Sequence, residues 1–210
     1  MKRIGFVGYE STDIALYLAR MFQNRGNATV VVDHTRRLLL MKNAGIPEEL
    51  IGKSGMYRNV EIYAGGLATK FPKDALIIDY FSYNTPLPEL KLCDIVIFVS
   101  DMMMCNAQQL KGIEIKEDAE KVLILRDAIP LKYKEKFLIK ETGIEISKDN
   151  VFVIPYDEND YRSRCYMCMD KKHKLTGLSD VMKKTLLSLY LGIEKVELTR
   201  KETALLLKNA

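Results

Sequence analysis

Short apolar, β-branched runs alternate along the chain with longer segments in which apolar residues recur at helical spacing. The runs that predict strands are Lys2–Val7, Ala28–Val32, Ala75–Ile78, Ile95–Ser100, Lys121–Leu125 and Val151–Ile154. Two of them are apolar on both faces, over residues 76–78 and 95–99, which is typical of parallel strands covered by helices on both sides. The pattern predicts an α/β fold, a doubly wound and mostly parallel sheet with helices on both faces.

Helical patterns begin and end the chain. Thr12–Asn24 carries a broad apolar face and is followed by Gly26, a plausible helix stop. Leu178–Leu191 repeats the pattern, and Thr199–Glu202 forms a capping-box sequence that predicts a last helix. Asn59–Tyr63 is expected as an extra edge strand. We predict a single domain over residues 1–210, with C-terminal helices from about 178 to 210.

Composition narrows the class of protein. A chain of 210 residues with 48% hydrophobic and 29% charged residues has material for one sizeable core and lacks the bias of disordered proteins. Uncharged runs reach only nine residues, as in Thr185–Ile193, too few to cross a bilayer. Four scattered cysteines and a start without a long apolar stretch argue against a secreted disulfide framework. We therefore expect a cytoplasmic protein.

Basic residues are concentrated near the end of the chain. The formal net charge is +4, and residues 171–210 contain nine Lys or Arg against four Asp or Glu. Such a region favours nucleic acid or a membrane surface as a partner, which would place the protein peripherally at a membrane; solvated helix faces are the alternative. Leu205–Leu207, flanked by basic residues, is the candidate membrane-associating segment, although it is only about one turn long.

The turn after the first strand is the expected ligand site, because helix N-termini in α/β sheets attract anions. On the phosphate-loop pattern G-x-x-x-x-G-K-[ST], Gly5 matches the first glycine and Thr12 the hydroxyl that reaches Mg²⁺. Glu10 and Ser11 stand at the second glycine and the lysine. A carboxylate facing phosphate at contact distance costs about 1–4 kcal/mol, so the pattern is degenerate.

The same turn can be laid on the dinucleotide fingerprint G-x-G-x-x-G. Gly8 fits, whereas Glu10 and Asp13 replace the other two glycines, and Asp33 ends the second strand as a ribose-binding acid would. Asp33 could equally cap the next helix. Either pattern fails alone, and because Glu10 would obstruct the pyrophosphate we expect no NAD or NADP binding.

Several further segments occur in the order and spacing of one known family. They are Ala15–Ala19, Arg25-Gly26, Val30–Asp33, Leu76–Tyr80, Cys93–Val99 and Val153–Asp157. Over about residues 2–168 the chain thereby resembles the ParA/MinD family of deviant-P-loop ATPases. The resemblance implies a P-loop NTPase-like fold that binds ATP or ADP with Mg²⁺ and works as a homodimer with protein partners.

The resemblance also suggests site residues. Thr12 would serve the metal, Asp79 would be the acid of the Walker B strand and Pro155 would lie near adenine, beside Gly5, Gly8 and Asp33. The departures concern catalysis: Phe6 and Ser11 stand where the family has lysines, and Thr35 where it has a second aspartate. Without these charges phosphoryl transfer loses its main stabilisation, so we expect no hydrolysis and an oligomeric state independent of ATP.

Cys165 and Cys168 have the spacing with which two thiolates hold one metal ion. A four-ligand zinc site, or an iron–sulfur cluster such as some relatives hold between subunits, would need a symmetric dimer. Two thiols without a metal are the simpler interpretation.

Three functions follow, in order of preference. The first is a non-hydrolysing ParA/MinD-like protein that acts as a positioning or assembly adaptor in pilus, secretion or partition machinery and retains residual nucleotide binding. The second is a nucleotide-linked oxidoreductase of Rossmann type. The third is a metal or cluster carrier that uses the cysteine pair.

Overall fold

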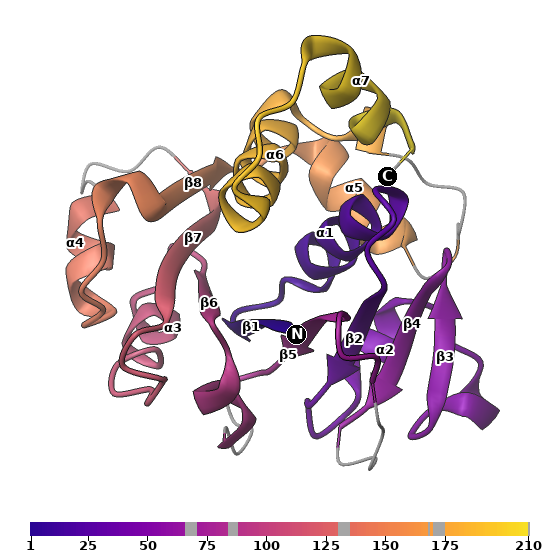
Figure 1. Ribbon diagram of the computed structural model, residues 1–210. Helices are drawn as coiled ribbons and strands as arrows, with labels where there is room; N and C mark the ends of the chain where they lie inside the picture. The colour runs from indigo at the N-terminus through magenta and orange to yellow at the C-terminus, as the bar shows by residue number, and fades with distance from the viewer. Residues whose placement is uncertain (66–70, 84–87, 130–134, 168, 170–174, 210) are drawn as a thin grey trace.

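The computed structural model describes residues 1–65, 71–83, 88–129, 135–167, 169 and 175–209. Eight strands form one sheet in the order β3-β4-β2-β5-β1-β6-β7-β8 (Figure 1). They are β1 (Lys2–Gly8), β2 (Thr29–Asp33), β3 (Ser54–Tyr57), β4 (Val60–Ala64), β5 (Leu76–Tyr80), β6 (Ile95–Ser100), β7 (Glu120–Ala128) and β8 (Val151–Pro155). Every neighbouring pair is parallel except β3 and β4. The α/β class and the mostly parallel sheet are confirmed.

The predicted edge strand at 59–63 is instead the second strand of the sheet. It forms β4, which is hydrogen-bonded to β2 on one side and to the antiparallel edge strand β3 on the other. The hairpin is closed by Arg58 and Asn59, which both adopt positive φ. The sequence pattern did not predict β3, because its four residues include an exposed serine, a glycine and an exposed methionine.

Helices cover both faces of the sheet (Figure 1). They are α1 (Thr12–Asn24), α2 (Leu39–Asn43), α3 (Met104–Gln108), α4 (Glu135–Glu141), α5 (Glu158–Tyr166), α6 (Asp180–Glu194) and α7 (Arg200–Asn209). One hydrophobic cluster joins the sheet to α1 and α6, and a second lies on the other face under α3 and α4. Ten of the 13 residues of α1 are buried, so this helix sits at the centre of the first cluster.

The last helix is attached to the rest of the molecule by its apolar residues. Thr199 and Glu202 form the predicted capping box, with Glu202 N–H donating to Thr199 Oγ1 and Thr199 N–H donating to Glu202 Oε2. Leu206 is 3% exposed and packs in the cluster that contains α1, whereas Leu205 projects into solvent. One leucine of the candidate membrane-associating segment is therefore used in packing within the protein, whereas Leu205 stays exposed.

The order of the strands bears on the dinucleotide alternative. The first strand, β1, is hydrogen-bonded to β5 and β6, and β5 separates it from β2. In the dinucleotide-binding fold the first strand instead pairs directly with the second. The topology therefore favours the phosphate-loop class over the Rossmann class.

None of the helices within the described ranges is both long and apolar enough to span a bilayer.

Candidate functional site: the turn before the first helix

Three residues connect the central strand β1 to the first helix α1. Because the connection is this short, the glycine pattern does not mark a long phosphate loop. Gly5 to Gly8 belong to β1, Tyr9 to Ser11 form the turn, and Thr12 opens α1. Gly5 faces a neighbouring segment instead of a ligand, since a Cβ there would lie 2.6 Å from Leu90 Cδ1. Half of the eight-residue stretch that would wrap a phosphate is thus strand.

Gly8 is required by the backbone. Its φ is +121°, and a Cβ would lie 2.1 Å from the carbonyl oxygen of Val99. The next residue, Tyr9, donates its N–H to that same oxygen at 2.8 Å. Gly8 therefore lets the turn close tightly against β6.

The chain's own side chains satisfy the N–H groups at the start of α1. Thr12 N–H donates to Glu10 Oε1 at 3.0 Å, and Ser11 N–H donates to the Tyr80 hydroxyl at 3.1 Å. Asn43 Nδ2 lies 3.4 Å from Glu10 Oε2 and 3.3 Å from Thr12 Oγ1, which holds the carboxylate in place. Because a helix N-terminus attracts negative charge, the Glu10 carboxylate occupies the kind of position in which helix N-termini bind phosphate.

A buried arginine contacts both the turn and α1. Arg126 on β7 forms a two-point ion pair with Asp13, with Nη1–Oδ1 at 2.8 Å and Nη2–Oδ2 at 2.9 Å, and donates from Nη1 to the Glu10 carbonyl at 2.6 Å. Both side chains are at most 2% exposed. Burial acts to raise the pKa of Asp13, but the charge and hydrogen bonds of Arg126 outweigh it, so this pKa lies below its ordinary value.

The two residues predicted to hold the metal ion do not meet. Thr12 Oγ1 contacts the Tyr80 hydroxyl at 3.3 Å, whereas Asp79, one position earlier on β5, points to the opposite face of the sheet. There Asp79 is fully buried and bound by Arg3 and by His34. Asp79 as a nucleotide ligand would thus require these contacts to be replaced.

Asp33, the candidate ribose acid, is also engaged. Its carboxylate accepts hydrogen bonds from Thr35 N–H at 2.9 Å, from the Thr35 hydroxyl at 2.6 Å and from Met41 N–H at 2.9 Å. The side chain is fully buried, and this burial raises its pKa. The structure gives Asp33 the capping role that the sequence left as an alternative, at the start of α2.

Pro155 and Cys165 belong to elements other than the turn. Pro155 ends the edge strand β8, with β6 and β7 between it and β1. Cys165 is exposed on α5, and Cys168 lies outside the described residues. Among the residues that the structure describes, no group of three or more His, Cys, Asp or Glu side chains is placed to hold a metal ion.

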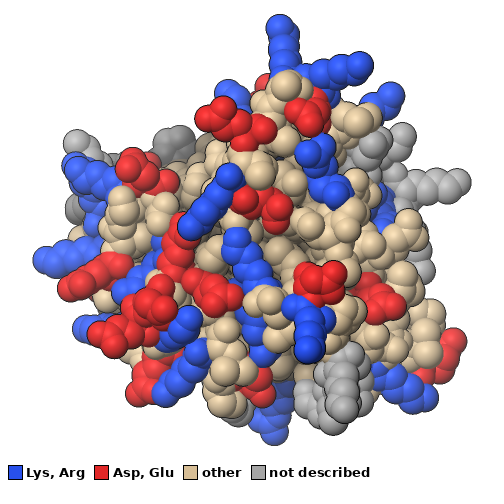
Figure 2. All heavy atoms as spheres, in the orientation of Figure 1, with Lys and Arg blue, Asp and Glu red and all other residues tan. Residues whose placement is uncertain are grey.

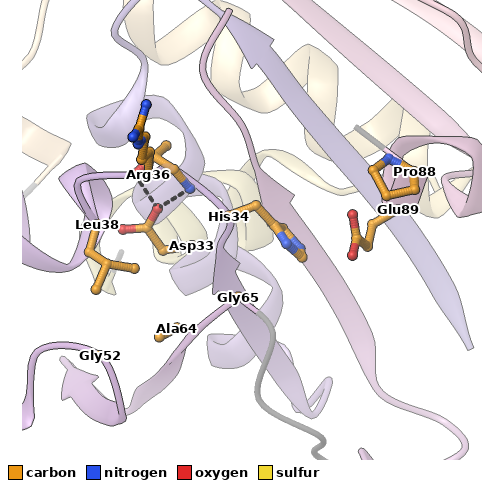
Figure 3. A pocket seen from close by; sticks show the side chains of 10 residues that line it. Asp33, His34, Arg36, Leu38, Gly52, Ala64, Gly65, Pro88 and Glu89 are labelled. Carbon is orange, nitrogen blue, oxygen red and sulfur yellow. Dashed lines mark hydrogen bonds between the residues drawn. The ribbon is translucent and has the colours of Figure 1, made fainter. Parts of the chain in front are cut away.

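A cavity of about 440 Å³ opens near the carboxyl ends of β2 and β4 (Figure 3). Its described lining comprises Asp33, His34, Thr35, Arg36, Leu38, Gly52, Ala64, Gly65, Pro88 and Glu89. His34, which no motif in the sequence singled out, has a side chain that is only 9% exposed. Arg126 was not predicted either, although one signal existed: it continues the alternation of Val122 and Ile124, which face α1.

Comparison with known proteins rests on structure alone, since the sequence matches no protein-family model and no curated protein. A ParA family ATPase from Chlorobium tepidum TLS is 17% identical, with a TM-score of 0.60 and coverage of 90% of this chain and 97% of that one. A plasmid partition protein from Borrelia burgdorferi B31, solved with AMPPNP, is 16% identical, with a TM-score of 0.59 and coverage of 93% and 99%.

The third similar structure is the MinC:MinD cell division protein complex of Aquifex aeolicus. It is 8% identical, with a TM-score of 0.56 and coverage of 95% of this chain and 98% of that one. At these identities the likeness establishes the fold and leaves activity open. Together with the strand order around β1, it shows that the chain has the ParA/MinD-like P-loop ATPase fold.

Proposed function

We propose that the protein is a non-hydrolysing ParA/MinD-like positioning or assembly adaptor. The observation that carries this proposal is the occupied start of α1, where Glu10 and Tyr80 take the N–H groups of Thr12 and Ser11 that would otherwise face a phosphate. The loop that would surround the phosphates is reduced to three residues. A protein with this fold and such a turn retains its surfaces for partners without a nucleotide-driven cycle.

The missing lysine charges at Phe6 and Ser11, together with the Glu10 carboxylate at the second glycine position, support the absence of hydrolysis. Stabilising the transition state of phosphoryl transfer depends on cations beside the transferred group. The cation nearest the turn, Arg126, is already paired with Asp13 and directed into the core. Residual nucleotide binding would require the Glu10 side chain to move away from the N-terminus of α1, which would expose Thr12 N–H.

The similar structures support protein partners for an adaptor of this kind. One is a complex of MinD with MinC, and another is a plasmid partition protein. On the face shown in Figure 2, acidic and basic side chains are interspersed, and basic side chains project from the end where α7 lies in Figure 1. A mixed-charge surface suits recognition of another protein better than sequence-independent binding of nucleic acid.

Thermal unfolding with and without millimolar Mg-ATP tests the proposal. We expect no rise in the melting temperature of the wild type and no phosphate release above a mock preparation, because Glu10 occupies the anion position. Glu10→Gln is the informative variant, since it removes the like charge at constant size. A wild type that is stabilised by Mg-ATP and hydrolyses it would overturn the proposal.

The oligomeric state gives a second test of the adaptor hypothesis. We expect light scattering to report the same mass with and without Mg-ATP, with a homodimer as the favoured state because two-fold pairs are the commonest assemblies. A monomer that pairs only on addition of ATP would show that the turn still senses nucleotide.

A further inference from the structure

The cavity beside β2 and β4 contains a histidine that is held rigidly on several sides. His34 Nε2 lies 2.8 Å from Asp79 Oδ1, and its ring stacks on Phe81 with centroids 4.6 Å apart and planes 9° apart. Asp79 is itself fixed by Arg3, with Nε–Oδ2 at 2.8 Å and Nη2–Oδ1 at 2.7 Å. The orientation of the imidazole in the cavity wall is therefore determined by a buried ion pair behind it.

This arrangement determines which ring nitrogen carries the proton. Burial tends to raise the pKa of Asp79, but hydrogen bonds from His34 and Arg3 more than compensate, so its pKa is below the ordinary value and the carboxylate is ionised. An ionised carboxylate can only accept, so Nε2 must donate. In the neutral imidazole Nδ1 then bears the lone pair, and it acts as a hydrogen-bond acceptor.

Nδ1 is the unused atom of this network. Within the described part of the chain no group donates a hydrogen bond to it. It faces the close approach of Gly65, where an added Cβ would lie only 2.8 Å away. A side chain that is about nine-tenths buried thus presents an acceptor without a donor at the wall of a cavity.

One carboxylate at this end of the cavity also favours a donor, although it lies near enough to the Arg3 guanidinium to contribute to the raised pKa of Arg3. The carboxylate of the half-buried Glu89 is turned toward His34, whereas the guanidinium of Arg36 points away from both (Figure 3). Leu38, Ala64 and Pro88 supply apolar surface along the same hollow. A volume of about 440 Å³ is in the range of small-molecule sites.

We propose that this cavity binds a small organic cation, an alkylammonium or alkylguanidinium, whose N–H donates to His34 Nδ1 and whose charge pairs with Glu89. The alkyl part would lie against Leu38, Ala64 and Pro88. Arg3 and Asp79 would act as positioning residues, since they orient the imidazole without touching the ligand. The site is separate from the turn before α1, so it does not depend on whether that turn admits nucleotide.

Nitrogen NMR of histidine provides a direct test, because the chain has only two histidines, His34 and His173. With 15N-labelled histidine and a His173→Asn variant for assignment, we expect His34 to be the Nε2–H tautomer. Addition of n-butylammonium or n-propylguanidinium should move the Nδ1 resonance of His34 in a saturable manner. n-Butanol and n-butyrate, which have the same kind of alkyl body without positive charge, should not.

Two charge-matched variants make the test decisive. Glu89→Gln should weaken binding of n-butylammonium about tenfold or more, the loss of a charge-assisted contact. Glu49→Gln removes an exposed carboxylate outside the cavity and should leave the affinity unchanged. The proposal is overturned by equal binding in Glu89→Gln and wild type, by a stronger response to n-butyrate, or by an Nδ1–H tautomer. Circular dichroism of each variant verifies that it is folded.

Discussion

Two buried Arg–Asp ion pairs lie on opposite faces of the sheet, and they differ in the groups that they contact besides each other. Arg126 and Asp13 form a closed pair, because both side chains are at most 2% exposed; Arg126 Nη1 also donates to the Glu10 carbonyl, and Nε lies 3.7 Å from Asp127 Oδ2. Arg3 and Asp79 form an open pair, because Asp79 also binds His34, whose other ring nitrogen lies at a cavity. One buried ion pair therefore holds a turn in place, whereas the other orients a side chain at a cavity.

The two pairs also differ in exposure. Arg126 is 1% exposed, whereas Arg3 is 17% exposed and so retains contact with water. In both pairs the carboxyl pKa is below its ordinary value despite burial. Each aspartate thus contributes stability above its unfolded pKa of about 4, and this stability is lost as the pH falls through the lower folded pKa.

Breaking the closed pair should have the largest effect. Arg126→Met leaves Asp13 buried without its partner, and the free energy of unfolding should fall by about 3–5 kcal/mol at neutral pH. Burial would then raise the pKa of Asp13, so the difference from the wild type should shrink as the pH falls toward about 4. Urea denaturation followed by circular dichroism at both pH values measures this.

Matched variants separate the ion pair from the packing. Arg162→Met removes an arginine that is paired with Glu158 on the surface of α5, and it should change stability little. Asp13→Leu combined with Arg126→Met should recover most of the loss, because no charge is left buried. If the double variant were as unstable as Arg126→Met, packing around Arg126 would account for the effect.

A substitution beside the open pair should lower the free energy of unfolding by less than Arg126→Met does. Gly65→Ala would place a Cβ 2.8 Å from His34 Nδ1 and 3.1 Å from the Asp33 carbonyl oxygen. The backbone cannot move away easily, so we expect a loss of about 1–3 kcal/mol and a displaced imidazole. Thermal unfolding measures the loss.

The control lies in α6, where Gly192 has no atom within 4 Å of an added Cβ. Gly192→Ala should raise stability by about 0.5–1 kcal/mol, since alanine is the better helix former. Equal effects of the two substitutions would show that the contact of Gly65 with His34 carries no strain.

The smallest expected effect concerns the hydroxyl that caps the turn. Tyr80→Phe removes the acceptor of Ser11 N–H and should lower the free energy of unfolding by about 1 kcal/mol. Tyr63→Phe, which removes an exposed hydroxyl, should have a smaller effect. Denaturant titration distinguishes the two variants. If Tyr80→Phe had the same free energy of unfolding as the wild type, water would replace the hydroxyl without loss of stability.

Local pattern predicted much of the fold because the relevant signals lie close together in the chain. The predicted first helix has the observed bounds Thr12–Asn24, and the strand Ile95–Ser100 was also located to the residue. β7 continues beyond the predicted Leu125 to Ala128, past a register shift that contains Asp127 at φ 53°. A bulge of this kind leaves no alternation to follow.

The candidate site was less predictable, because its contacts join distant segments. No residue near Asp13 in the sequence indicates that Asp13 pairs with Arg126, which lies 113 positions later. The glycines suggested a phosphate loop although the predicted strand Lys2–Val7 already contained Gly5, and in the structure this strand extends to Gly8. Likewise, the burial of His34 depends on Asp79 and Phe81, which come from another strand and its following residue.

The central place of β1 has a consequence during synthesis. This strand leaves the ribosome before both of its partners, β5 and β6, so its two edges are paired only after Ser100 has emerged. Until then β1 is an apolar strand with unpaired N–H and C=O groups, and another strand can pair with it incorrectly. We therefore expect nascent chains truncated before β6 to need chaperones, whereas the finished protein does not.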